Sequence, residues 1–243
     1  FEGCTSLLSA PELPATTMEQ GCYSQMFAGC TSLKSAPELP AEVLATNCYR
    51  YMFRGCSTLT SAPELPATTM EQGCYFGIFS ECTGLTSAPK LPANVLANNC
   101  YGWMFKGCSA LASAPELPAT EMGSYCYNGM FANCTKLTSA PELPAKRLES
   151  NCYNCMFEGC TSLTSAPELP AKELIRNCYQ LMFKDCSKLR YVKALFTTSP
   201  SEETTKDWLS GVAASGTFVK SKNATWNVTG VHSIPKGWKI ETQ

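Results

Sequence analysis

The sequence has a single histidine, few charged residues and no long hydrophobic run. His232 is the only histidine among 243 residues, which excludes a multi-histidine metal site. No apolar stretch approaches the roughly 18 residues that a membrane-spanning helix needs. Charged residues make up only 16% of the sequence, and 19 basic residues balance 20 acidic ones. The totals therefore give no indication of nucleic-acid binding or of attraction to an anionic membrane.

One segment of 26 residues recurs along most of the chain. Met26–Tyr51 (MFAGCTSLKSAPELPAEVLATNCYRY) returns from Met52, Ile78, Met104, Met130 and Met156, after a truncated copy at Phe1–Gln25 and before a decaying one at Met182–Leu195. A fixed period of this length predicts a repeat architecture. We expect a solenoid of about eight units over 1–195, with the first and last units incomplete, and a separate segment at 196–243. Because Phe1 lies inside a repeat, we expect the chain to be part of, or processed from, a longer protein.

Fifteen of the 16 cysteines fall in two columns of the repeat. The first column is Cys4, Cys30, Cys56, Cys82, Cys108, Cys134, Cys160 and Cys186, and the second is Cys22, Cys48, Cys74, Cys100, Cys126, Cys152 and Cys178. Free cysteine is a small hydrophobe that is often buried, so we predict buried free thiols, with disulfides inside each repeat as the alternative. Cys152 and Cys155 match the Cys-x-x-Cys motif of redox and zinc sites. We interpret this match as incidental, because Cys152 belongs to its column and no second pair lies nearby.

Within a repeat, the apolar pattern predicts a short strand followed by a helical return. Leu33–Leu39 is short and extended, since proline restricts the residue before it. From Ala41 the apolar residues are spaced by 3, 4, 4 and 4, close to one helical face. Asn47 precedes a cysteine and could cap a second short helix, so the return could consist of one helix or of two. Gly55 lies where the helix would end.

The stacked strands should form a narrow parallel ladder about 4.8 Å apart, because each proline removes one hydrogen-bond donor. We expect this ladder to be only two or three residues wide. A thin sheet opposite bulkier helices should curve the array into an arc that is concave on the strand side.

The motif L-x-x-A-P-x-L-P-x-x-x-L-x-x-x-C-Y-x-x-M-F-x-x-C resembles the BspA-like leucine-rich repeats of bacterial cell-surface proteins. The resemblance covers residues 1 to about 195, although Met52-Phe53 stands where the family commonly has Ala-Phe. It implies an α/β repeat solenoid, a right-handed arc with a short parallel β-ladder on the concave side, helical segments on the convex side and a small α+β C-terminal cap. It also implies a secreted or surface-anchored protein with a role in adhesion. The family brings no catalytic residues and no cofactor.

The segment 196–243 is predicted to cap the array. Ser199–Glu202 resembles a helix start, with a capping box and a proline at the first helical position. The apolar stripe Thr205, Trp208, Leu209 and Val212 predicts one helix, and Thr217–Lys220 and Trp238–Glu241 predict short strands. Arrays of this kind expose apolar surface at their ends. The N-terminal repeat has no such cover, so we expect it either to be capped by sequence that is missing here or to self-associate.

Two further columns recur in every repeat. The predicted binding column on the strand is Glu12, Glu38, Glu64, Lys90, Glu116, Glu142 and Glu168. Six stacked glutamates repel one another, and we predict an acidic stripe that receives a basic protein segment or weakly binds Ca²⁺. The alternative is a solvated position copied with the repeat. A tyrosine follows each second-column cysteine, and we predict that it packs between repeats with its hydroxyl at the rim.

The sequence therefore predicts a non-catalytic scaffold that recognises a protein or glycan through its repeat surface at the exterior of a bacterial cell. A structural stalk that presents another domain is the alternative. An enzyme is disfavoured by the single histidine and by the lack of a carboxylate pair beside a nucleophile. We expect no metal, no cofactor and no nucleic-acid partner.

Overall fold

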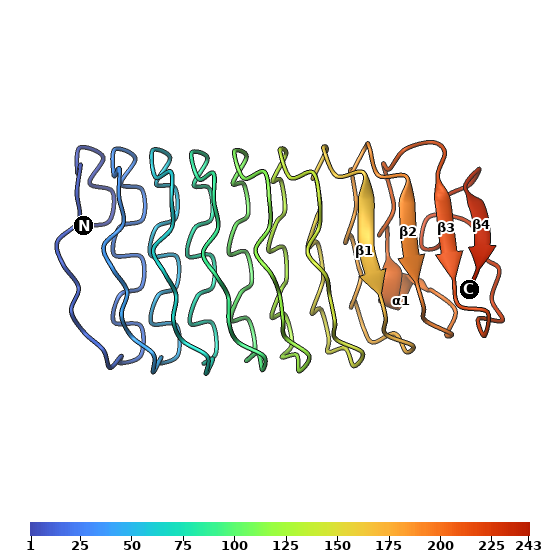
Figure 1. Cartoon of the computed structure of the whole chain (residues 1–243), viewed down its shortest axis with the longest axis horizontal. Coiled ribbons are helices and arrows are strands. Elements are labelled where there is room, and N and C mark those ends of the chain that lie inside the picture. The colour runs from blue at the N-terminus through green and yellow to red at the C-terminus, as the bar shows by residue number, and fades with distance from the viewer.

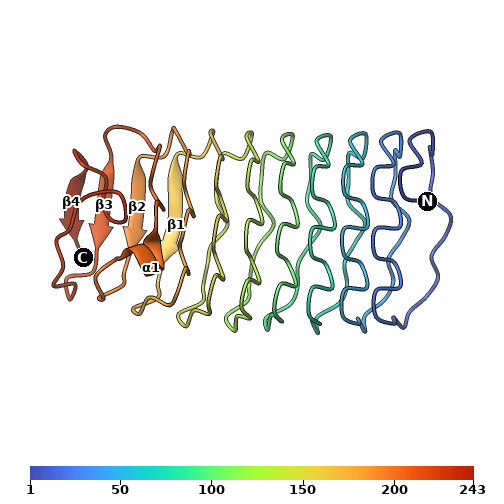
Figure 2. The same cartoon turned by 180° about the vertical axis from the view of Figure 1, so that it is seen from behind.

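The computed structural model describes all 243 residues as a row of stacked coils, with one coil per repeat. The N-terminus and the C-terminus lie at opposite ends of the row (Figure 1). Figure 2 shows the same row from behind. Each coil has an extended side, which carries the Ser-Ala-Pro-x-Leu segment and is called the ladder face below. The opposite side, which carries the Asn-Cys-Tyr segment, is called the turn face.

The parallel ladder that the sequence predicted is confirmed, but it is narrower than expected over most repeats. Four strands, β1 (Ser165–Leu169), β2 (Tyr191–Ala194), β3 (Thr217–Lys220) and β4 (Lys239–Thr242), form one parallel sheet in the order β1-β2-β3-β4. Earlier coils are joined on this face by isolated bridges such as Ser9 with Ser35 and Ser61 with Ser87. The proline of each repeat removes a ladder donor, whereas β2, β3 and β4 contain no proline and pair along their whole length.

The predicted helices on the convex side are wrong. The only helix of the chain is α1 (Glu202–Thr205), which lies beyond the repeats. On the turn face, alternate residues donate to the next coil, as Tyr49 N does to Cys74 O over 3.0 Å. The residues between them donate to the carbonyl three residues earlier, as Arg50 N does to Asn47 O over 3.2 Å. The turn face is therefore a succession of β-turns, each hydrogen-bonded to its copy in the next coil.

These turns have a period of four residues, which explains the misassigned helix. Every fourth residue is left-handed: φ is 56° at Asn47, 53° at Tyr51 and 73° at Gly55. Apolar steps of four therefore point inward in this turn series just as they do on a helix. Asn47 does not cap a helix and Gly55 does not end one. Both columns favour asparagine and glycine because these residues tolerate positive φ best.

The loss of the helices also removes the reason for a strongly curved arc. The predicted curvature rested on a thick helical side opposite a thin sheet. Instead, both faces of a coil are single layers of extended or turning backbone, and the row runs nearly straight in the plane of Figure 1. The right-handed arc stays a prediction of the family resemblance.

The core is a set of side-chain stacks that run the length of the row. Phenylalanines such as Phe53, Phe79 and Phe105 stack with ring centroids 5.8 Å apart. Tyr49 and Tyr75 stack at 5.6 Å, which confirms that the tyrosine column packs between repeats. The predicted position of the hydroxyls is wrong at these two residues, because both hydroxyls are buried and have no hydrogen-bond partner.

The prediction of buried free thiols is confirmed. All 16 cysteines are free, and all except Cys4, Cys22 and Cys155 are buried. From Cys30 onward, each thiol of the first column donates to the carbonyl of a phenylalanine in the preceding coil. Cys108 Sγ, for example, lies 3.1 Å from Phe79 O. The column thus combines a well-filled core with a hydrogen bond between coils, a role that the sequence analysis did not foresee.

The segment 196–243 continues the row. β3 has the predicted bounds, and β4 begins one residue later than predicted. The predicted helix is cut to the single turn α1, with Ser201 as its N-cap. The chain then resumes the inter-coil ladder, since Phe183 N donates to Trp208 O over 2.8 Å. Trp208 and Trp226 are buried, and Trp226 stacks on Phe196 at 5.2 Å. No helix in the chain is long and apolar enough to cross a membrane.

Candidate binding surfaces

The predicted binding column lies exposed along the ladder face. All seven side chains, from Glu12 to Glu168, are exposed. Glu168 forms an ion pair of 2.7 Å with Lys193, its register partner on β2. The other six, Lys90 among them, form no ion pair. The parallel ladder brings the column together at a spacing of about 4.8 Å between neighbouring coils.

Prolines flank this column and stiffen its surroundings. A shallow hollow of about 520 Å³ is lined by Pro115, Glu116, Pro118, Pro141 and Glu142. A second hollow of about 360 Å³ continues the line past Lys146 to Glu168. Because proline fixes φ, the backbone that carries these carboxylates loses little conformational freedom when a ligand binds. The ladder face is thus a preformed, mostly acidic strip.

The turn face carries three aromatic side chains that lean over glycines of the following coil. Tyr51 lies against Gly77, Phe76 against Gly102 and Trp103 against Gly129; a Cβ atom at these glycines would come within 2.4, 2.8 and 2.7 Å of the respective rings. Basic groups lie beside the rings. Arg50 Cζ is 4.5 Å from the Phe76 centroid, and Lys106 Nζ is 4.3 Å from that of Trp103.

A groove of about 610 Å³ opens beside Trp103 on the turn face. Its lining is mostly polar and includes Trp103, Lys106, Asn128, Gly129, Ala132, Asn133, Asn154, Cys155, Glu158 and Asp185. Hydrophobic spacing and motifs did not predict this site. The signal was present in one repeat column, where Tyr51, Gly77, Trp103, Gly129 and Cys155 alternate between large and small residues. A small residue after a large one leaves a hollow on a surface built of identical coils.

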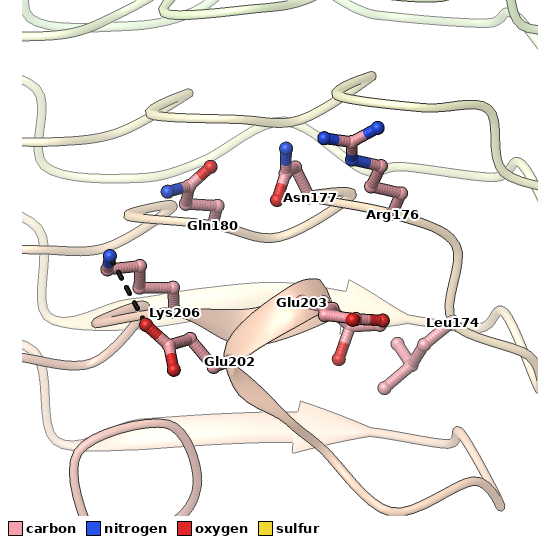
Figure 3. Close-up of a pocket in the computed structure, with 8 residues that line it drawn as sticks. Leu174, Arg176, Asn177, Gln180, Glu202, Glu203 and Lys206 are labelled. Carbon is pink, nitrogen blue, oxygen red and sulfur yellow. Dashed lines mark ion pairs between the residues drawn. The ribbon is translucent and has the colours of Figure 1, made fainter.

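A wider hollow of about 800 Å³ lies where α1 meets the last repeat (Figure 3). Arg176, Asn177 and Gln180 line it from the repeat, and Glu202, Glu203 and Lys206 line it from α1 and the residue after it. Lys206 Nζ and Glu202 Oε1 form an ion pair of 3.4 Å. Leu174 is its one apolar residue, so the hollow offers a ligand little apolar surface to contact.

The Cys152–Cys155 pair has the properties of ordinary, unreactive thiols. Burial raises the pKa of the Cys155 thiol to about 12, with a further contribution from the charge of Glu158. Burial also raises the pKa of Cys152 well above its ordinary value. Since the thiolate is the reactive species, neither residue has the lowered pKa of a redox cysteine. Cys155 Sγ donates to Asn154 Oδ1 over 2.8 Å.

His232 lies in the C-terminal segment, away from the cysteine columns. Its Nδ1 accepts a hydrogen bond of 3.4 Å from Asp207 N, and its carbonyl accepts one of 2.6 Å from Thr205 Oγ1. These contacts fix the loop around His232 to α1 and the residues after it. No cluster of three or more histidine, cysteine or acidic side chains is placed to hold a metal ion.

Comparison with known proteins identifies the class of repeat. A family model described as a BspA type leucine-rich repeat region matches residues 1–112 and 104–202, in six copies. The chain therefore belongs to the BspA-type leucine-rich-repeat family, as the sequence motif indicated. Proteins of this kind are generally binding or scaffold proteins.

No curated protein matches the chain. Among solved structures, a leucine-rich repeat protein from Bacteroides ovatus ATCC 8483 is similar to it. The alignment covers 100% of this chain and 76% of that one, with 17% sequence identity and a TM-score of 0.43.

Proposed function

We propose that this chain is a non-catalytic adhesion scaffold at a bacterial cell surface, and that its ladder face binds a basic segment of a partner protein. The observation that supports the proposal most strongly is the exposed column from Glu12 to Glu168. It places a negative charge in six of its seven coils, and only Glu168 has an ion-pair partner. The surface location is inferred from the family.

The electrostatics of the column favour a basic partner. Neighbouring carboxylates lie closer together than the Debye length of about 8 Å at physiological salt, so their fields add. The column extends past the range of any one charge, which suits an extended segment with several lysines or arginines. Lys90 divides the column into two acidic parts, Glu12–Glu64 and Glu116–Glu168, and so sets where the positive charges of a partner can lie.

The test compares two sets of substitutions that remove the same charge from the same repeats. Glu12→Gln, Glu64→Gln and Glu142→Gln remove three of the six negative charges of the column. Glu19→Gln, Glu71→Gln and Glu149→Gln neutralise exposed glutamates seven residues further on in each repeat. Binding of the purified chain to an array of lysine-rich and arginine-rich peptides, and to bacterial and host cell-surface proteins, is measured at low and physiological salt.

We expect the column variant to bind basic peptides about tenfold more weakly at low salt, and the control variant to match the wild type. Binding should also weaken as salt rises, because screening shortens the reach of exposed charges. Equal losses in both variants would show a response to net charge alone and would refute the assigned face. A wild-type chain that binds no ligand of the array would favour the alternative, a stalk that spaces another domain from the cell.

A further inference from the structure

We propose that the groove beside Trp103 binds a neutral oligosaccharide, with the indole as the surface on which a sugar ring stacks. This site lies on the turn face, opposite the acidic column, and does not depend on the protein-binding role of the ladder face. Its volume of about 610 Å³ is within the range of small-molecule sites, about 300–1,000 Å³. A short, linear chain of sugars fits a groove of that size which is open to solvent.

The groove exists because one coil carries smaller residues than the coils on either side of it. Gly129 and Ala132 form its floor. In the preceding coil the same two repeat positions hold Trp103 and Lys106, and in the following coil they hold Cys155 and Glu158. The two flanking coils are two coil spacings apart, or roughly 10 Å at 4.8 Å per coil. The indole of Trp103 lies over Gly129 within that width, so it forms the surface that a sugar ring entering the groove meets.

Trp103 is held in an unusual conformation that presents its ring to the groove. Its φ is 55°, a left-handed geometry that is uncommon for a bulky aromatic residue. The absence of a side chain at Gly129 is what allows the indole to lie across the next coil, since a Cβ atom there would be 2.7 Å from Trp103 Cδ1. Phe76 supports the indole from the other side, with ring centroids 5.3 Å apart.

The polar groups of the groove match the hydroxyls of a sugar. Asn154 donates to Gln180 Oε1 over 3.0 Å and accepts from Cys155, so its orientation is fixed. The amides of Asn128 and Asn133 line the groove and make no side-chain hydrogen bond within the chain. Each amide offers both a donor and an acceptor, which is the combination that a hydroxyl needs.

The charges of the groove favour an uncharged ligand. Lys106 brings one positive charge, and Glu158 and Asp185 bring two negative ones. Lys184 lies 3.6 Å from Glu158 and offsets part of that charge. A polyanion would meet Glu158 and Asp185, and a basic peptide would meet Lys106. The ammonium of Lys106 lies over the indole at 4.3 Å, and its flexible stem lets it turn onto a ligand hydroxyl.

Intrinsic fluorescence tests the proposal directly, because Trp103 is the one tryptophan of four that is not buried. The probes are four neutral tetrasaccharides, built of glucose with α or β linkages, of mannose and of N-acetylglucosamine, and one sulfated tetrasaccharide. Acrylamide quenching of the folded chain is measured with each probe at millimolar concentration. We expect at least one neutral probe to protect the indole, and the sulfated probe to give no protection.

Two variants identify the site by isothermal titration calorimetry. Trp103→Ala removes the stacking surface and should weaken binding by about tenfold or more. Ala132→Lys fills the floor with a side chain that the same column already carries at Lys106 and Lys184, so it should fold normally and also abolish binding. Tyr51→Ala is the matched control, because Tyr51 occupies the same column, has the same left-handed φ and leans over Gly77.

The outcomes separate cleanly. Protection of the indole by a neutral probe, together with calorimetric binding that Trp103→Ala and Ala132→Lys weaken and Tyr51→Ala retains, supports the site. Protection by the sulfated probe alone, no protection by any probe, or binding that survives Ala132→Lys would overturn the proposal. The glutamate substitutions on the ladder face should leave the titration unchanged.

Discussion

The two cysteine columns are predicted to respond in opposite ways to the same pair of substitutions. Cys108 belongs to the first column and donates from Sγ to Phe79 O over 3.1 Å. Cys100 belongs to the second column and makes no side-chain hydrogen bond. Both residues are fully buried. The two sites therefore differ in hydrogen bonding but not in burial.

At Cys108, alanine removes both the sulfur and the hydrogen bond. The net value of one hydrogen bond is about 1 kcal/mol, and the lost burial of one heavy atom adds about 1 kcal/mol. Phe79 O keeps one donor, because Cys82 N also bonds to it over 3.1 Å, so no further cost arises there. We expect Cys108→Ala to lower the free energy of unfolding by about 2 kcal/mol. Cys108→Ser keeps a donor near the same carbonyl and should lower it by about 1 kcal/mol.

At Cys100 the order should reverse. Cys100→Ala loses only the burial of the sulfur and should lower the free energy of unfolding by about 1 kcal/mol. Cys100→Ser places a hydroxyl where the thiol has no acceptor, and burying such a group costs about 1–3 kcal/mol. The serine variant should therefore be the less stable one at this position.

Urea unfolding followed by circular dichroism, with one common slope for the four variants, gives the differences from the midpoints. We expect the serine variant to be more stable than the alanine variant at Cys108 and less stable than it at Cys100. If serine is worse than alanine at both positions, the first column acts as a hydrophobic filler and its hydrogen bonds to the preceding coil contribute nothing measurable.

Three further predictions follow from the same geometry. Asn99→Ala should lower the free energy of unfolding, measured with urea, by about 1 kcal/mol, because Asn99 has a φ of 58° and this conformation strains alanine. Asn99→Gly should cost much less, and equal losses in the two variants would contradict the left-handed assignment. Iodoacetamide at neutral pH should label Cys4 and Cys22 first, as mass spectrometry will show, and prompt labelling of the buried cysteines would contradict the packing. Burial raises the pKa of Cys56, Cys108 and Cys160 from 9.0 to about 12. Between these two pH values the unfolded chain releases thiol protons that the native chain keeps. Stability should therefore hold below about pH 9 and fall as the pH rises toward 12. A urea midpoint that stays flat over that window would refute the last of these.

The sequence predicted the repeat and the parallel ladder because both depend on regular spacing. An unbroken 26-residue step fixes the register between coils, and the proline in Ser-Ala-Pro limits the ladder. The width of the ladder was overestimated because proline limits the pairing more strongly than expected. Tyr191–Ala194 has no proline and pairs fully, whereas the earlier segments make single bridges.

The turn face could not be predicted from hydrophobic spacing alone. Apolar steps of four satisfy a helix and also satisfy a turn series with a left-handed residue at every fourth position. One repeat column conceals the turn series. Its residues Tyr51, Trp103 and Cys155 are neither glycine nor asparagine, yet their backbone is left-handed. Only hydrogen bonds to the next coil, such as Tyr51 N to Phe76 O at 2.8 Å, stabilise that geometry, and they do not appear in one repeat considered by itself.

The two candidate sites also differ in how far the sequence could predict them. The acidic column is visible in the sequence because one residue type recurs at one position, and its exposure on the ladder face follows from the strand. The Trp103 groove depends on a difference between neighbouring repeats. Trp103, Gly129 and Cys155 are unremarkable as single residues, and they form a site only when the coils bring them side by side.

This contrast assigns different kinds of recognition to the two faces. The stacked core requires nearly the same backbone in every coil, so a column that keeps its residue type can only build an extended, uniform surface. The ladder face has that property and suits a partner that reads charge over many coils. A column that changes from coil to coil builds a local shape, and the turn face between Tyr51 and Cys155 is where such changes concentrate. Substituting one residue should therefore affect recognition strongly at the groove and only slightly along the acidic column.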